Sequence, residues 1–320
     1  MNSATEHQVN TGLNRILLCI DSTTSSRRLA AFVRHLATEK TQVHIVGVLE
    51  NARAVLPLGP LAAFNLSAAH AQLLRAVKAG CLAAHECLTA SGASVDSEII
   101  DLVKDGGDAA HALSHEAQKW QADLMVLGSR HHRGLLRWVE RAASAPVLKI
   151  AGCAILVVPG QCERDWSGRP QRMLFAIDGS PASLEALRIG SKLAAADGLL
   201  KAIYVVDRAA RVTDFVPLSV LQDAFVEEGK VALEKAREVF AHSRDAGGVM
   251  LDAELAETEL SGDDVAHAIA REATRWQPDL LVMGTHGRRG VARWMLGSVS
   301  GRVAELTQTP LLLVRKDDSR

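Results

Sequence analysis

The 320-residue sequence lacks several signatures that would assign a function directly. It has no GxxxxGK[ST] loop, no GxGxxG turn opening either half of the chain, and no GxSxG elbow. At the level of motifs this excludes P-loop ATPases, the common dinucleotide-binding enzymes and α/β-hydrolases. The polar start, MNSATEHQVNTG, has no apolar signal core, and no apolar run reaches the length of a membrane span. We therefore expect a soluble, cytoplasmic protein with no membrane partner.

Charge and cysteine patterns exclude further classes. The formal net charge is −1, so no basic field predicts a nucleic-acid partner. The 5 cysteines form no CxxC pair, and their odd number argues against a disulfide framework and for a reducing compartment. His111 and His115 have a spacing that can chelate a metal, but no further ligand follows at a useful distance. We predict no metal site.

An internal repeat is the most informative feature present. WQADL at 120–124 matches WQPDL at 276–280, and Gly128 matches Gly284 at the same separation. RILLCIDSTTSS parallels RMLFAIDGSPAS, which places Asp21 against Asp178, and AILVVP parallels PLLLVR at the ends of the halves. We predict a duplication with a domain at 1–159, a linker at 160–171 and a second domain at 172–320.

Apolar, strand-like runs alternate with helical patterns in each half. The strands expected in the second half are Met173–Asp178, Leu200–Val206, Val249–Leu255, Leu280–Gly284 and Leu311–Val314. The helices expected between them are Ala182–Ala195, Leu218–His242, Asp264–Trp276 and Ser298–Leu306. The first half gives the same series, from Ile16–Asp21 to Ile155–Val158. Continuous apolar strands separated by helices indicate parallel sheets covered on both faces, so we predict two doubly wound α/β domains.

The loop GTHGRRGVARWMLGSVS at 284–300 follows a predicted strand and leads into a predicted helix. Ligands of open parallel sheets lie at the carboxyl ends of the strands, and a helix start favours an anion. Gly287 and Gly297 would allow positive φ and a close approach of backbone to phosphate oxygens. Ser298 and Ser300 can donate hydroxyl hydrogen bonds. We predict a phosphate site here, although such a connection can also be no more than a tight turn.

The spacing of this loop, G-2x-G-9x-G-S, resembles the nucleotide-binding signature of the universal stress protein family. DGSPAS after the first strand and YVVD at the second extend the resemblance over almost the whole of both halves. It implies Rossmann-like domains similar to the adenine nucleotide alpha hydrolases, each with a five-stranded parallel sheet of order 3-2-1-4-5. It also implies bound ATP, or ADP or AMP, with any Mg²⁺ carried by the phosphates.

The same resemblance assigns site residues in the second half. It places Asp178 beside the adenosine and the main chain near Val205 and Gly284 at the base or ribose. The full set of nucleotide-binding residues expected is Ala176, Asp178, Val205, Gly284, His286, Gly287, Arg288, Gly297, Ser298, Val299 and Ser300.

The first half is a degenerate copy of this signature. His131, Arg141 and Ala142 stand where Gly287, Gly297 and Ser298 would be. Side chains at the two close-approach positions block a backbone cradle, so we predict weak or no nucleotide binding there. The alternative is that the loop rearranges and still binds.

Single-domain members of the family commonly pair their last strands. Here Ala154–Val158 and Leu311–Val314 could pair within one chain as a pseudo-dimer, and a further homodimer stays open.

Three functions compete at this stage. The leading one is a nucleotide-dependent stress-response regulator in which ATP orders the loop from Thr285 to Leu296 and alters a surface facing an unidentified protein partner. The second is a slow ATPase in which His286 activates water. The third is an interaction scaffold with a vestigial pocket. No catalytic residue is assigned.

Overall fold

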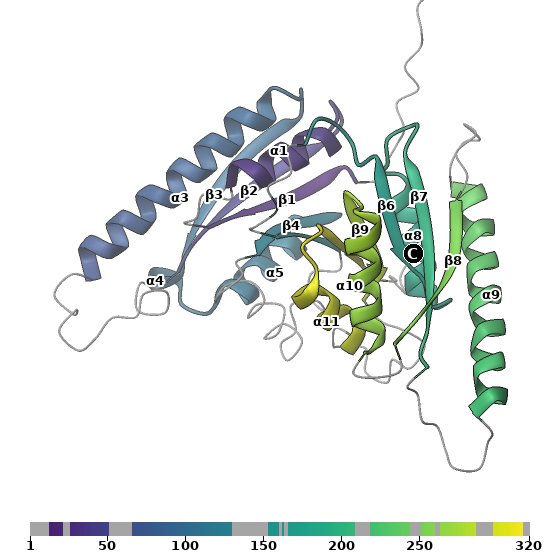
Figure 1. Ribbon diagram of the computed structural model, residues 1–320. Helices are drawn as coiled ribbons and strands as arrows, with labels where there is room; N and C mark the ends of the chain where they lie inside the picture. Colours follow the sequence, from purple (N-terminus) through teal and green to yellow (C-terminus); the bar gives the residue numbers. More distant parts are fainter. Residues whose placement is uncertain are drawn as a thin grey trace, which may run out of the picture.

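A computed structural model describes residues 13–21, 26–50, 66–129, 153–159, 162, 166–208, 218–243, 251–259, 263–285 and 297–315 (Figure 1). The first half contains, in chain order, β1 (Arg15–Ile20), α1 (Ser26–Leu36), β2 (Gln42–Leu49), α3 (Leu66–Thr89), β3 (Ser94–Asp101), α4 (Leu102–Asp105), α5 (Ala109–Lys119), β4 (Leu124–Ser129) and β5 (Ala154–Pro159).

The second half repeats the strand series with its own helices. Its elements are β6 (Arg172–Ala176), α8 (Pro181–Ser191), β7 (Leu199–Val206), α9 (Leu218–Ser243), β8 (Leu251–Glu257), α10 (Val265–Trp276), β9 (Leu280–Gly284), α11 (Ser298–Leu306) and β10 (Leu311–Val314).

The strands of the described residues form one 10-stranded sheet of order β3-β2-β1-β4-β5-β10-β9-β6-β7-β8. Within each half every strand pair is parallel and follows the predicted order 3-2-1-4-5. The predicted fold class is therefore confirmed. A chain order that reverses beside the first strand of each half is the doubly wound arrangement.

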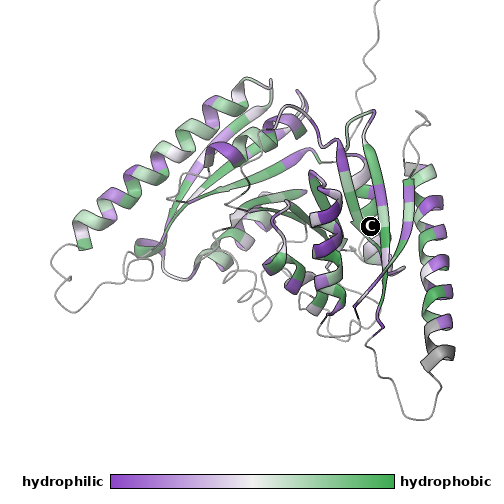
Figure 2. Ribbon diagram, in the orientation of Figure 1, coloured by the Kyte–Doolittle hydropathy of each residue, from purple (hydrophilic) through white to green (hydrophobic). Residues whose placement is uncertain are grey.

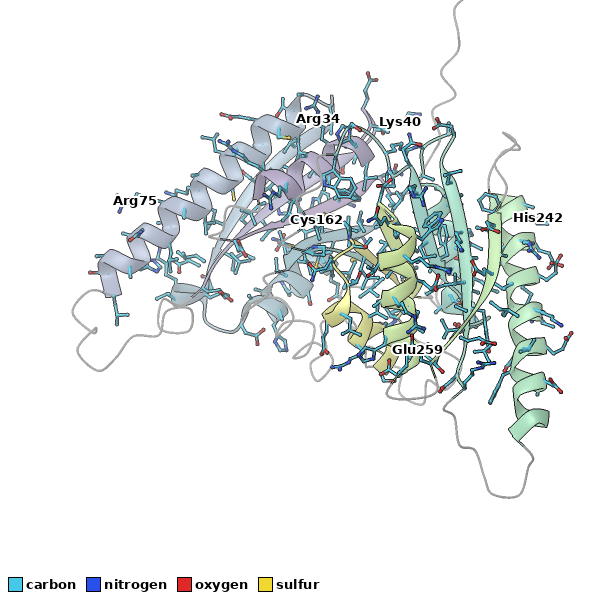
Figure 3. All side chains as sticks on the ribbon, in the orientation of Figure 1. Arg34, Lys40, Arg75, Cys162, His242 and Glu259 are labelled. Carbon is cyan, nitrogen blue, oxygen red and sulfur yellow. The ribbon has the colours of Figure 1, made fainter. Side chains whose placement is uncertain are left out.

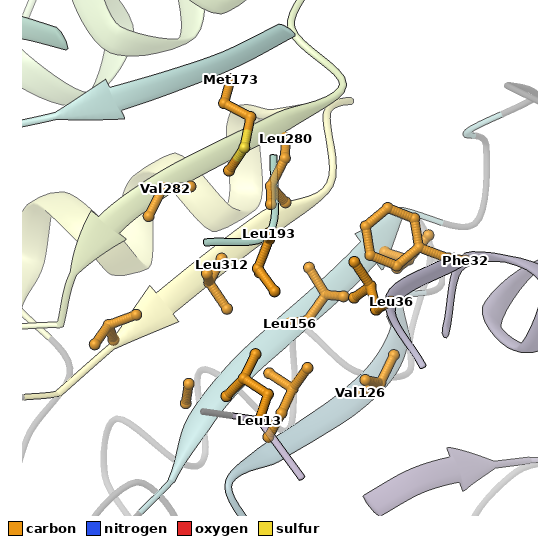
Figure 4. Packing of buried hydrophobic residues seen from close by; sticks show 14 of the residues in the cluster. Leu13, Phe32, Leu36, Val126, Leu156, Met173, Leu193, Leu280, Val282 and Leu312 are labelled. Atoms are coloured by element: carbon orange, nitrogen blue, oxygen red, sulfur yellow. The ribbon is translucent and has the colours of Figure 1, made fainter. Parts of the chain in front are cut away.

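The two halves join through their last strands. β5 and β10 pair antiparallel, with Leu312 opposite Leu156, as expected for a pseudo-dimer within one chain. Both leucines are fully buried in one hydrophobic cluster that continues across the seam, from Phe32 on α1 to Leu280 on β9 (Figure 4). Pairing the two edges removes exposed strand edges from the middle of the molecule.

Helices cover both faces of the sheet. The cluster that crosses the seam lies beneath α1, α3, α8 and α9, and separate clusters lie beneath α5 in the first half and beneath α10 and α11 in the second. Central strands are mostly hydrophobic, whereas α3 and α9 mix hydrophobic and hydrophilic residues (Figure 2). Arg75 on α3 and His242 on α9 lie at opposite ends of the molecule (Figure 3).

Several predicted boundaries need correction. β6 ends at Ala176 rather than Asp178, although Ile177 still donates to the carbonyl of Ile203 at 2.8 Å. β8 ends at Glu257 instead of Leu255, and α8 ends at Ser191 instead of Ala195. α10 begins one residue late because Asp264 is its N-cap and accepts from the N–H of His267. β9, β10 and α11 have the predicted bounds.

The WQxDL repeat is a structural anchor at the end of α5 and of α10. Trp276 packs beneath the guanidinium of Arg172, 4.4 Å from the ring centroid, and Gln277 takes a left-handed conformation at φ 51°. The Asp279 carboxylate accepts from the N–H of Arg172 at 2.8 Å. Trp120, Gln121 and Asp123 repeat this arrangement with Arg15. The strongest sequence repeat therefore holds the first residues of β1 and β6 in position and does not mark a ligand site.

Part of the predicted linker packs on the first half. The Trp166 ring meets Phe32 edge-on, with centroids 4.4 Å apart, and His35 Nε2 lies 2.7 Å from the Trp166 carbonyl oxygen. These contacts hold the segment against α1.

All 5 cysteines are free thiols, as expected for a chain without a disulfide framework. Burial raises the pKa of the Cys81 thiol to about 11 and that of Cys153 to about 12, so both stay protonated near neutral pH. Within the described residues, no helix combines the length and apolarity that crossing a membrane requires.

Candidate functional site

The candidate site lies where the strand order of the second half reverses. After β6 the chain adds β7 and β8 on one side, and it later returns to add β9 and β10 on the other. Ala176, the last residue of β6, pairs with Met283 of β9 and with Ile203 of β7. The loops that follow β6 and β9 therefore leave the sheet side by side, at the edge where ligands bind in such folds.

The loop after β6 is a tight turn into α8. The Asp178 carboxylate accepts a 2.9 Å hydrogen bond from the N–H of Ser180, and Gly179 has φ +77°. Ser180 then caps α8 by accepting from the N–H of Ser183 at 3.2 Å, and Pro181 occupies the first helical turn. These local bonds fix the position of Asp178 at the switch point.

Gly284 ends β9 against the first turn of α8. A Cβ at this position would lie 2.8 Å from the Ser183 nitrogen and 2.9 Å from the Ala182 carbonyl carbon, both of which are backbone atoms. The glycine is therefore needed for packing between strand and helix, a reason that differs from the ligand contact that the sequence suggests.

Thr285 ties β9 to β10 and to the start of α11. Its N–H donates to the carbonyl of Val314 at 2.9 Å, and its own carbonyl accepts from the N–H of Gly297 at 2.8 Å. The side chain of Thr285 is buried. The sequence placed Thr285 only at the start of the loop that ATP is expected to order, since a threonine at the end of an apolar run carries no recognisable motif.

No side chain of the described residues caps the N-terminus of α11. Gly297 occupies the N-cap position and offers no side-chain acceptor, and the first N–H donors of an α-helix have no carbonyl four residues back to bond. Ser298 is exposed at the same helix start and Val299 is half-buried. N–H groups that no backbone carbonyl of the described residues accepts, together with the positive end of the helix dipole, make this a place for an anion.

Two expectations about the glycine loop need correction. Gly297 has φ −58° and ψ 148°, so it does not use the positive φ that we expected. The advantage of glycine here is the missing side chain.

Ser300 is buried, and its hydroxyl lies 3.1 Å from the Thr285 carbonyl and 3.0 Å from that of Gly297. Its single hydroxyl proton is thus used within the protein, which leaves its backbone N–H for a ligand.

The other predicted site residues divide into two groups. Val205, near the end of β7, is half-buried against the core beneath α10 and α11. His286, Gly287 and Arg288 lie outside the described residues.

The degenerate signature of the first half is described only in part. Asp21 follows β1, as Asp178 follows β6, and Gly128 lies in β4. His131, Arg141 and Ala142 lie outside the described residues, so the loss of the first site stays a prediction.

A duplicated charge cluster was missed by sequence reasoning. In the second half Lys201 forms an ion pair with Glu254, and Arg275 pairs with Glu272 at 2.6 Å. The bond from Lys201 is the main cause that holds the pKa of Glu254 below its usual range. By strand register and the sequence repeat, His44, Glu98 and Glu116 occupy the equivalent places of the first half. Aligning the two halves strand by strand would have placed His44 against Lys201.

Comparison with known proteins agrees with this architecture. The family model described as "Universal stress protein family" matches residues 12–159 and again residues 170–315. A universal stress protein of Mycolicibacterium smegmatis is 26% identical over 314 residues, which cover 94% of this chain and 96% of that protein. One from Methanocaldococcus jannaschii is 33% identical over 153 residues, or 46% of this chain and 82% of the relative.

A solved structure is similar over both halves. The universal stress protein of Archaeoglobus fulgidus DSM 4304 has a TM-score of 0.58 at 16% identity, and the alignment covers 98% of this chain and 100% of that one. At this identity the likeness concerns the fold. Because the family model matches both halves in turn, this chain belongs to the universal stress protein family.

Proposed function

We propose that the second half binds one adenine nucleotide, ATP or a product of its hydrolysis, and that the protein is a nucleotide-dependent regulator of a stress response. The observation that carries this proposal is the start of α11, which is uncapped and lies at the switch point of the sheet. It supplies donors and a positive dipole end where an anionic ligand is expected.

The phosphates would lie against the first turn of α11. The N–H groups of Ser298, Val299 and Ser300 are the donors that helix geometry leaves unpaired, and the exposed Ser298 hydroxyl adds another. The side chain missing at Gly297 lets phosphate oxygens approach the backbone. His286, Gly287 and Arg288 would close the loop around the phosphates, which would carry any Mg²⁺.

The adenosine would lie over the carboxyl ends of β6 and β7. Asp178 is held at the switch point by its bond to the N–H of Ser180, and Ala176 and Val205 border the same edge. The assignment of the base and ribose to these residues, and to the main chain at Gly284, follows the family signature rather than the local geometry.

Regulation suits this site better than catalysis. Among the described residues at the switch point, Asp178 and Ser300 are engaged in bonds that shape the loops. Nucleotide binding would instead bridge the two ends of the segment between Thr285 and Gly297, which are already joined by a 2.8 Å hydrogen bond. A change in that segment would be read by a protein partner in the cytoplasm.

We further propose a division of labour between domains at 1–159 and 172–320, joined by 160–171. The first domain would serve as a scaffold, since three of its signature positions carry His131, Arg141 and Ala142. Its last strand supplies the pairing partner for β10.

Replacing Ser298 by aspartate or by asparagine tests the phosphate site. Ser298→Asp places a negative charge at the helix start, where it stabilises the helix but repels phosphate. Ser298→Asn is the uncharged control, because asparagine has the same size as aspartate. Loss of charge-assisted bonds worth about 1.5–3 kcal/mol should weaken ATP binding by roughly 10-fold to 100-fold in Ser298→Asp, measured by calorimetric titration. Equal ATP affinity in Ser298→Asp and Ser298→Asn would place the phosphates elsewhere.

A further inference from the structure

Three potential metal ligands from separate elements converge on one face of the first half. They are His44 on β2, Glu98 on β3 and Glu116 on α5, and their ligand atoms all lie within 4.8 Å of one another. His44 Nε2 is 3.6 Å from Glu116 Oε1 and 4.0 Å from Glu98 Oε2. The His44 and Glu116 side chains are only 7% and 8% exposed, while Glu98 opens the cluster to solvent.

The His44 ring is held with Nε2 facing the two glutamates. Its Nδ1 lies 2.9 Å from Asp96 Oδ1, and the ring stacks on Trp120 with centroids 5.4 Å apart and planes 26° apart. Neither ring nitrogen makes a well-aligned hydrogen bond with any residue that the structure describes, although both are buried. Asp96 thus lies beside the ring nitrogen that faces away from the glutamates, where metal-bound histidines commonly have a carboxylate.

In the second half, a positively charged side chain occupies the position that is equivalent to His44. Lys201, at the position of His44, is buried and forms an ion pair with Glu254. Arg275 bridges Glu254 at 3.3 Å and Glu272 at 2.6 Å. The first half keeps both carboxylates, as Glu98 and Glu116, and has histidine in place of the lysine.

The distances suit coordination better than hydrogen bonding. Zinc bonds of 2.0–2.2 Å in a tetrahedron put neighbouring ligand atoms about 3.3–3.6 Å apart, whereas an N–H···O bond has its atoms about 2.9 Å apart. The 3.6 Å separation of Nε2 from Glu116 is at the upper end of the first range, and the 4.0 Å separation from Glu98 lies just above it. The separations within the set reach at most 4.8 Å, and rotation of the exposed Glu98 carboxylate would shorten those that involve it.

We propose that His44 Nε2, Glu98 and Glu116 bind one divalent transition-metal ion of the Zn²⁺ type, with water at the remaining position. One imidazole and two carboxylates are too few and too nitrogen-rich for a Ca²⁺ or Mg²⁺ site. In the first half, the ion would have the role that the Lys201 ammonium has in the second half. It would tie edge strand β3 to α5.

Lys119 is the group that the ion must displace from Glu116. Its ammonium donates to both Glu116 oxygens at 3.1 Å, and its side chain is 58% exposed. It can therefore swing into solvent when the ion binds.

The test is a titration of the full chain with Zn²⁺ by calorimetry and with Co²⁺ by visible absorption. His44→Lys copies the second half and should stay folded while losing one Zn²⁺ equivalent. Glu116→Gln should weaken that equivalent by at least about 10-fold. His111→Gln, which changes an exposed histidine on α5 bonded to Asp108, is the control and should retain it.

The reciprocal variant Lys201→His should gain a site, because Glu254 and Glu272 stand where Glu98 and Glu116 do. The proposal is overturned if wild-type protein binds no Zn²⁺ with a Kd below about 100 µM. It is equally overturned if His44→Lys retains every equivalent that wild type binds.

Discussion

Gly284 and Gly297 belong to one loop signature, but the structure gives them different roles. Gly284 allows the end of β9 to touch the backbone of α8. Gly297 leaves the start of α11 without a capping side chain. A sequence signature shows that both positions are glycine, yet it cannot separate packing from ligand access, because the partner segments are far apart in the chain.

Replacing Gly284 by alanine should destabilise the protein. The new Cβ would clash with backbone atoms of Ser183 and Ala182, which cannot rotate away. We expect a loss of about 1–3 kcal/mol in the free energy of unfolding, measured by urea denaturation. Gly168→Ala is the control, because its Cβ would meet nothing within 4 Å. Similar unfolding midpoints for both variants would contradict the close packing.

At the site, the residues that sequence could assign were those with a motif. Asp178, Gly284, Gly297 and Ser298 all follow apolar strands or begin a helix, and the structure brings the loops that carry them together. Thr285 and the His44 cluster could not be found in this way. Their partners lie on other strands, and which strands adjoin depends on topology and register.

Helix ends are the element-scale feature that repeats most faithfully. Gln121 and Gln277, which follow α5 and α10, both have φ 51°. A glutamine in this left-handed region costs free energy that a glycine would not. The bounds of β9 and β10 could be predicted because a change from apolar to polar residues or glycine marks the end of each strand. α8 ends at Ser191, before the predicted Ala195, because no periodic pattern distinguishes its last turn from the turn after it.

Gln277→Gly should therefore stabilise the protein. Relief of the left-handed backbone outweighs the added chain entropy, and we expect a gain of up to about 1 kcal/mol in unfolding free energy. Ala270→Gly in the middle of α10 is a right-handed control that should lose about 1 kcal/mol. Midpoints in guanidinium measure both changes, and a loss of stability in Gln277→Gly would refute the interpretation.

At the scale of the whole molecule, the seam between β5 and β10 unites the two halves. β5 and β10 each have a neighbouring strand on both sides, whereas β3 and β8 are the outermost strands that the structure describes. The sequence could predict this pairing because two apolar final strands would otherwise be exposed. It could not show that one hydrophobic cluster continues across the seam beneath α1 and α8.

Hydrogen exchange should reveal the seam directly. Amides in 154–159 and 311–314 have hydrogen-bonded neighbours on both sides and should exchange slowly, like those of β1 and β6. The edge segments 94–101 and 251–257 should exchange first. Mass spectrometry of proteolytic fragments measures both, and fast exchange at β5 and β10 would mean that the halves separate in solution.

The whole molecule has two copies of one fold, but we propose that only one retains a nucleotide site. Counting the nucleotides on each chain tests this asymmetry most directly. Native mass spectrometry of the wild-type protein in ATP should find one adenine nucleotide per chain, and the fraction of chains that carry it should fall in Ser298→Asp. Two nucleotides per chain would mean that the first half also binds, and none would contradict the assigned site at α11.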